Sequence, residues 1–171
     1  MIAMNHYFRR ILTFLMFLLC INSFAASLAD DARNRGINET CSNYLSQVDE
    51  SFDLNGFNIT FAHPEEPSKL SSHHISMQKY NNASSVFSAT LTPDGESCNH
   101  STVLVTSVND KTCLEIAKQK KEIDSTLQPS SYADGGFITL TSSTNNFQII
   151  LISSGEKSCT IVEARMIWPG K

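Results

Sequence analysis

Histidines are the side chains of this sequence best suited to holding a metal ion. Four of them follow residue 25, at His63, His73, His74 and His100. Neighbouring residues of a strand point to opposite faces, so His73 and His74 cannot bind one ion together if they lie on a strand. No H-E-x-x-H motif occurs. We therefore expect exposed polar histidines and predict no metal site.

The sequence supports nucleophilic catalysis as little as it supports a metal site. The sequence contains no G-x-S-x-G motif and no glycine-rich phosphate loop, because its seven glycines are scattered. We assign no catalytic residue and no cofactor. The sequence favours a non-catalytic binding or interaction module whose partner is an unknown protein or small molecule. The alternative is a secreted or periplasmic hydrolase or metal-dependent enzyme. A pocket that joins His63, His100 and a carboxylate would favour this enzyme, whereas a smooth sheet face would favour the module.

Residues 1–25 have the order of a secretory signal peptide. Two arginines precede an apolar run, Ile11–Ile21, and small residues indicate cleavage after Ala25. The run is shorter than the roughly 20 residues of a membrane-spanning helix, which argues against an uncleaved anchor. A lipoprotein signal would need a small residue before Cys20, where Leu19 stands. We expect an exported protein, periplasmic or extracellular, that is not an integral membrane protein after signal cleavage.

Four cysteines remain after the signal, Cys41, Cys98, Cys113 and Cys159. An even number in an exported chain predicts two disulfides, and the absence of a C-x-x-C spacing argues against zinc ribbons and thioredoxin-type sites. A bond between Cys98 and Cys113 is disfavoured because a strand of about nine residues carries the chain about 30 Å between them. Cys41–Cys113 would join two helices that usually lie 8–10 Å apart on a sheet, which is too far for a disulfide. We therefore predict Cys41–Cys98 and Cys113–Cys159.

An internal repeat supports this pairing. Thr-Cys begins a helix twice, at Thr40-Cys41 and Thr112-Cys113, and a Gly-Glu turn precedes a cysteine twice, at Gly95–Cys98 and Gly155–Cys159. The repeat divides the sequence into two similar halves. Each half has one cysteine on its helix and one at the start of its last strand.

The net charge of the chain limits the kinds of partner that it can bind. Cleavage after Ala25 removes 2 of the 13 basic residues and none of the 17 acidic ones, so the net charge changes from −4 to −6. A chain this acidic is a poor nucleic-acid binder. The second predicted helix is locally basic, which indicates a solvated face or, alternatively, a docking patch for an acidic partner or a membrane surface. Its lysines are Lys111, Lys118, Lys120 and Lys121.

Hydrophobic periodicity predicts the elements. Helices are expected from Asn38 to about residue 54 and over about 110–124. Strands are expected at 57–61, 75–80, 87–91, 102–108, 137–141, 147–152 and 160–167, with a polar loop at 128–136. In the last strand, Val162, Ala164, Met166 and Trp168 are expected to face the core, and Glu163 and Arg165 the solvent.

The predicted fold is α+β, with a largely antiparallel sheet, two helices packed on one face, an αβββ-type pseudo-repeat and two disulfides. Residues 26–36 are expected to form a flexible N-terminal arm, and residues 37–171 a single domain.

Overall fold

The computed structural model describes residues 27–52, 54, 56–132, 136–142 and 147–167, so the predicted signal peptide and Trp168 lie outside the described residues. The helices are α2 (Leu28–Asn34), α3 (Glu39–Phe52) and α4 (Cys113–Ile123). The strands are β1 (Phe57–Phe61), β2 (Ser72–Lys79), β3 (Ala83–Asp94), β4 (Ser97–Asn109), β5 (Leu127–Tyr132), β6 (Phe137–Ser142), β7 (Phe147–Gly155) and β8 (Ser158–Ile167).

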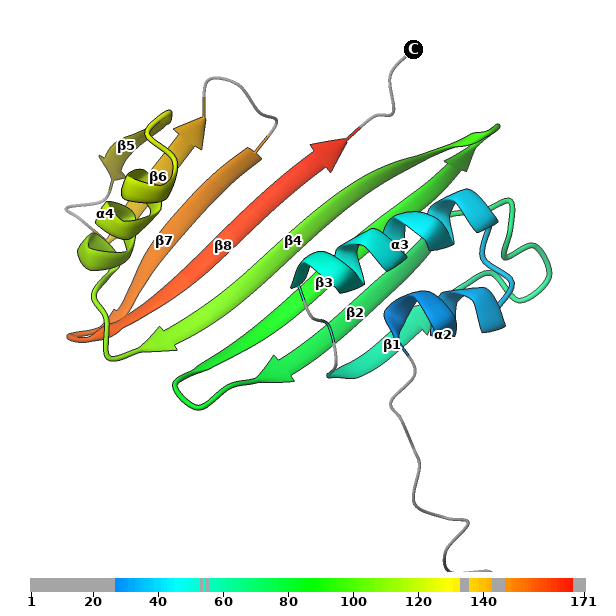
Figure 1. The fold of residues 1–171 in the computed structure, drawn as a ribbon, viewed down its shortest axis with the longest axis horizontal. Coiled ribbons are helices and arrows are strands. Elements are labelled where there is room, and N and C mark those ends of the chain that lie inside the picture. The colour runs from blue at the N-terminus through cyan, green and yellow to red at the C-terminus, as the bar shows by residue number, and fades with distance from the viewer. Residues whose placement is uncertain (1–26, 53, 55, 133–135, 143–146, 168–171) are drawn as a thin grey trace, which may run out of the picture.

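All eight strands form one antiparallel sheet. Their order is β1-β2-β3-β4-β8-β7-β6-β5, so β4 and β8 meet at the centre and β1 and β5 form the edges (Figure 1). Each half contains a helix followed by four strands, α3 before β1–β4 and α4 before β5–β8, and the first half has the additional helix α2. From the centre outward, the strands of each half follow in reverse chain order, β4 to β1 on one side and β8 to β5 on the other. The two halves are therefore related by an approximate twofold axis between β4 and β8.

The predicted two-helix α+β packing is wrong. The structure is 52% strand and 24% helix, so one large sheet dominates and three short helices accompany it. Residues 28–34, expected as part of a flexible arm, form α2 instead, with Leu28 and Ala32 buried. The predicted polar loop at 128–136 contains strand β5, so the second half has four strands, like the first, rather than the three expected.

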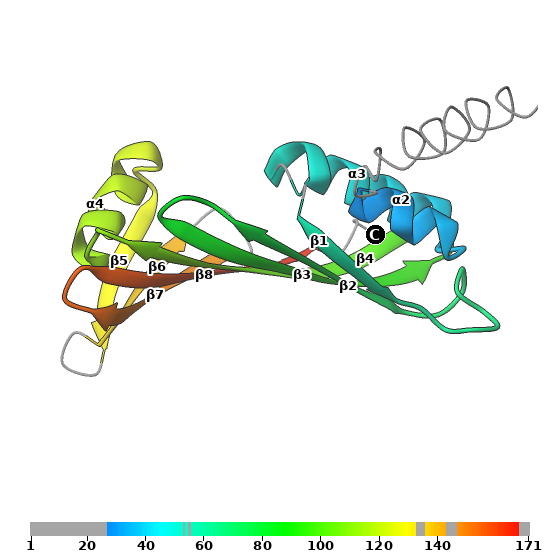
Figure 2. The same ribbon diagram turned by 90° about the horizontal axis from the view of Figure 1, so that it is seen from below.

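Strand register divides the side chains between two faces. Phe87 of β3 lies opposite Leu104 of β4, and both are on the face that carries the helices. Leu104 lies opposite Glu163 of β8, which in turn lies opposite Ile149 of β7. We call the side of the sheet that carries α2, α3 and α4 the helix-covered face, and the opposite side the helix-free face (Figure 2). The helix-covered face has two hydrophobic cores, one under α2 and α3 and one under α4.

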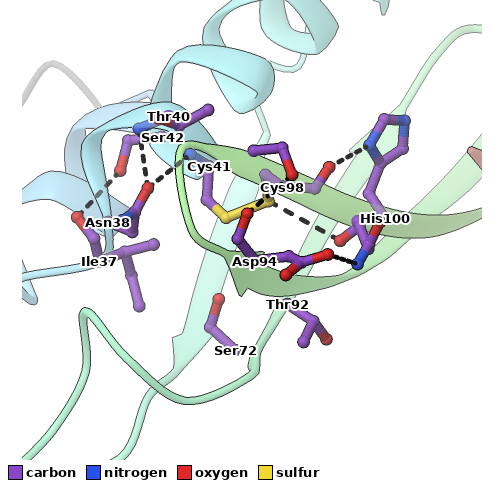
Figure 3. The surroundings of a disulfide bond; sticks show 12 residues. Ile37, Asn38, Thr40, Cys41, Ser42, Ser72, Thr92, Asp94, Cys98 and His100 are labelled. Carbon is purple, nitrogen blue, oxygen red and sulfur yellow. Dashed lines mark hydrogen bonds between the residues drawn. A yellow bond between two sulfur atoms is a disulfide. The ribbon is translucent and has the colours of Figure 1, made fainter. Parts of the chain in front are cut away.

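Each core is joined to its helix by a disulfide. Cys41 of α3 is bonded to Cys98 at the start of β4, with Cα atoms 5.2 Å apart (Figure 3). Cys113 of α4 is bonded to Cys159 at the start of β8, with Cα atoms 5.1 Å apart. These are the pairs that the internal repeat predicts. Asn38 caps α3, because its side-chain oxygen accepts hydrogen bonds from two backbone N–H groups of the first turn.

Candidate functional site

The centre of the helix-covered face lies between the two cores and contains a groove. The groove has a volume of about 310 Å³ and is bordered by α3, the strands β3, β4 and β8, and the beginning of β7. Its lining residues are Tyr44, Gln47, Val48, Ser51, Phe52, Phe87, Thr102, Leu104, Phe147, Glu163, Arg165 and Ile167. Charged, hydroxyl and aromatic side chains therefore converge beside α3, at the centre of the sheet.

The two faces of β8 are the reverse of the prediction. Glu163 and Arg165 lie on the helix-covered face and line the groove, while Val162, Ala164 and Met166 lie on the helix-free face. The alternation of residue types defined two faces correctly but did not show which one the helices cover. Because the helices leave the centre open, charged side chains on the covered face still reach water.

The charges in the groove are unevenly paired. The ammonium group of Lys120, on α4, forms an ion pair with Glu163. The guanidinium carbon of Arg165 lies 5.2 Å from the centre of the Phe147 ring, a cation–π arrangement. Arg165 has no carboxylate partner among the ion pairs of the described residues. The groove therefore offers one guanidinium to an anionic group.

Tyr44 and His100 form a second polar element beside the groove. Their rings stack with centroids 3.5 Å apart. His100 Nδ1 lies 3.4 Å from the carbonyl oxygen of Cys98, which can only accept, so Nδ1 carries the proton in the neutral ring (Figure 3). Nε2 of His100 is buried without a hydrogen-bond partner in the described residues. Burial lowers the pKa of His100 and raises the pKa of Tyr44, so both rings are neutral near pH 7.

The remaining histidines lie elsewhere and do not converge with His100. His63 follows β1, and its Nδ1 accepts hydrogen bonds from the backbone of Glu65 and Glu66. The strands β2 and β3 separate β1 from β4, so roughly 14 Å of sheet lies between His63 and His100.

Adjacent histidines of β2 point to opposite faces, as expected. His74 is buried under the helices, while His73 lies on the helix-free face and hydrogen-bonds to Thr90. The expectation that all histidines are exposed is therefore wrong for His74 and His100. Within the described part of the chain, no three His, Cys, Asp or Glu side chains are grouped to hold a metal ion.

The helix-free face is the second candidate site. Of the large apolar side chains that the structure exposes, seven lie on this face: Phe57, Phe61, Met77, Val86, Tyr132, Phe137 and Met166. Half-buried valines and isoleucines of β4, β7 and β8 fill its centre. In the described strands its ionisable side chains are His73, Lys79 and, at the end of β3, Asp94. The face is thus broad and nearly uncharged, and its apolar side chains are interspersed with uncharged polar ones such as Ser88, Ser101 and Thr139.

One sequence signal for this face was available. Val103, Leu104 and Val105 are consecutive apolar residues of β4, and β7 has a similar run from Ile149 to Ile152. Consecutive apolar residues put apolar side chains on both faces of a strand, which is typical of a sheet covered on both sides. The structure covers only one side, so the other side is left as an exposed apolar surface.

No protein-family model, curated protein or solved structure matches this chain. None of the helices in the described residues is both long and apolar enough to cross a membrane. The two disulfides suggest an oxidising environment.

Proposed function

We propose that the chain is an exported, disulfide-stabilised interaction module that self-associates through its helix-free face. The observation that carries this proposal is the broad, nearly uncharged surface on that face, on which seven large apolar side chains are exposed. Such a surface was the feature expected of an interaction module rather than of an enzyme. Export rests on the composition of residues 1–25 and is supported by the two disulfides.

The size of the helix-free face supports a protein partner. Eight strands give seven spacings of about 4.8 Å, and strands about 25 Å long then give an area of about 850 Å². A stable interface buries about 800 Å² on each partner, so this face alone has the required area.

Its charge and symmetry favour a second copy as the partner. A nearly neutral apolar surface has little to attract nucleic acid or an anionic membrane, but it meets its own copy with little like-charge repulsion. A closed dimer requires a surface that is complementary to itself. Two twisted sheets whose faces carry interdigitating valines and isoleucines meet that requirement when they stack about 10 Å apart.

A charge placed on the face tests the proposal. Val86 is 41% exposed on β3, so Val86→Lys leaves the core intact but buries two unpaired ammonium groups in the dimer. We expect the dissociation constant of the dimer, measured by light scattering, to rise at least about 100-fold. Leu114→Lys on α4 is the matched control, because Leu114 is 72% exposed and lies away from this face.

Three outcomes would contradict self-association through the face. The first is a Val86→Lys variant that dimerises like the unsubstituted chain. The second is a dimer that is lost in Leu114→Lys and kept in Val86→Lys. The third is a folded chain that stays monomeric, whether or not it binds phosphatidylcholine vesicles. Circular dichroism of both variants shows that they fold.

A small-molecule site in the central groove is the second candidate function. The unpaired guanidinium of Arg165 and the aromatic rings of Tyr44 and Phe147 favour an anionic ligand with an apolar part. The hydrolase or metal-dependent enzyme gains less support, because His63, His74 and His100 lie at separate places.

A further inference from the structure

The two halves of the sheet are covered differently. In the first half, α2 lies beside α3 and contacts β1 and β2 (Figure 1). In the second half, α4 itself contacts the corresponding strands, β5 and β6, and no second described helix lies beside it. A hollow of about 650 Å³ occupies that place, between α4, β5, β6 and the end of β7.

The disulfides align α3 with α4 residue by residue. Cys41 corresponds to Cys113, so each residue of α3 corresponds to the residue of α4 that lies 72 positions later. Ser46 and Asp49 of α3 hydrogen-bond to α2, and helical spacing puts Ser42 and Leu45 on the same side. The counterparts of these four residues are Leu114, Ala117, Lys118 and Lys121. All four counterparts line the hollow. The hollow is therefore the place that α2 fills in the first half.

Exposure agrees with this correspondence. Ser42 is fully buried beside α2, whereas its counterpart Leu114 is 72% exposed. The strand side of the hollow is formed by Pro129 of β5 and Ile138 of β6. Apolar groups therefore line a space on the side of α4 that corresponds to the α2 side of α3, and no described residue packs into it.

The charges that line the hollow differ from those around α2. This difference determines which kind of helix can bind in the hollow. In the first half, the carboxylate of Asp49 accepts a hydrogen bond from the backbone N–H of Ala29, 3.0 Å away, in the first turn of α2. Lys121 stands at the corresponding position of α4 and Lys118 one turn before it. Neither lysine forms an ion pair within the described residues. A pair of lysines repels the N-terminus of a helix and attracts carboxylates or a helix C-terminus.

The geometry points to a docking site for an acidic amphipathic helix of a partner protein, about as long as the 7-residue α2. The apolar face of that helix would pack on Leu114 and Ile138, and its carboxylates would pair with Lys118 and Lys121. Glu156, on the rim nearest the start of α4, directs the acidic side of the helix toward the two lysines. A copy of α2 in the orientation it has in its own half would place its N-terminus against Lys121, which disfavours a second copy as the occupant.

A peptide pair tests the site. The probe is a labelled, stapled two-turn peptide with leucine and alanine on one face and glutamate beside it; the staple is needed because free helices this short are unstable in water. Its twin has lysine in place of glutamate. We expect saturable binding of the acidic peptide by fluorescence anisotropy and little binding of the twin. Lys118→Glu/Lys121→Glu should weaken the acidic peptide at least about tenfold and strengthen the twin.

The control variant is Arg35→Glu/Lys69→Glu, which changes the net charge equally on exposed residues of the first half that lie outside both the hollow and the helix-free face. It should leave the affinity for the acidic peptide within about twofold. Absence of saturable binding, or equal loss in both double variants, would overturn the site. A dimer of the chain that is lost in Lys118→Glu/Lys121→Glu would overturn the partner assignment in favour of a second copy. The inference does not depend on self-association through the helix-free face, since Val86→Lys leaves this hollow unchanged.

Discussion

His74 shows how burial sets the behaviour of a single residue. Its side chain is fully buried under the helices, with Nδ1 3.1 Å from the Thr60 hydroxyl and Nε2 2.8 Å from the Ser72 hydroxyl. Two hydroxyl groups satisfy a neutral imidazole, which has one donor and one acceptor. Burial, with a smaller contribution from the neighbouring His73, lowers the pKa of His74 to about 4, and Asp31 opposes this weakly. His74 is therefore a structural residue, although the sequence predicted an exposed polar histidine.

The stability of the protein should fall on acidification because of His74. The unfolded chain binds a proton on this histidine near pH 6.5 and the folded chain only near pH 4, so the unfolded state is favoured as the pH falls through that window. The loss is at most about 3 kcal/mol. We expect denaturant unfolding to show this fall between pH 7 and 4.5 and His74→Gln to reduce it, with His63→Gln as control. The buried His100 adds a fall of the same sign. An equal pH dependence in the His74→Gln variant would contradict this account.

Among the elements, those with a clear hydrophobic period were predictable. α4 begins at the capping box of Thr112 and Glu115, close to the predicted start at about residue 110, and the alternation of Phe87, Ala89 and Leu91 marks the buried side of β3. β5 was missed because it is polar, contains Pro129 and forms a sheet edge, where proline is tolerated.

Tertiary packing decided the elements and faces that the sequence left open. α2 was missed because Leu28, Ala29 and Ala32 are too few and too small to give a strong helical period. It is held instead by its contacts with α3, β1 and β2. The groove was unpredictable for a related reason: whether Glu163 faces helices or water depends on where α3 and α4 lie, which no local pattern specifies.

Each disulfide should stabilise the half that contains it. The Cys41–Cys98 bond spans 57 residues and the Cys113–Cys159 bond spans 46. The chain-entropy model gives about 4 kcal/mol for each. We expect Cys41→Ser/Cys98→Ser to lower the free energy of unfolding by up to that amount, with Cys113→Ser/Cys159→Ser as the comparison. Non-reducing peptide mapping should find only these two pairs, and a peptide joining Cys41 to Cys113 would contradict the structure.

The whole molecule consists of two similar halves that share one sheet. Each half has its own core and disulfide on the helix-covered face, and the central strands join them. This arrangement leaves three surfaces without a cover in the described residues: the central groove, the hollow beside α4 and the helix-free face. The helix-free face is the largest of these, and its shortage of charge distinguishes it from the other two.

Export makes a separate prediction for the whole chain. If residues 1–25 are a cleaved signal, the mature protein begins at Ala26 and α2 follows almost at once. Intact-mass spectrometry of protein recovered from outside the cytoplasm should give the mass of residues 26–171. A mass that retains residues 1–25 would contradict cleavage.

Sedimentation equilibrium of the mature protein over a wide range of concentration tests the proposed interaction face most directly. The account predicts a monomer–dimer equilibrium that shifts toward monomer in Val86→Lys and is unchanged in Leu114→Lys. A chain that remains monomeric at every concentration, while circular dichroism shows it folded, would contradict the account.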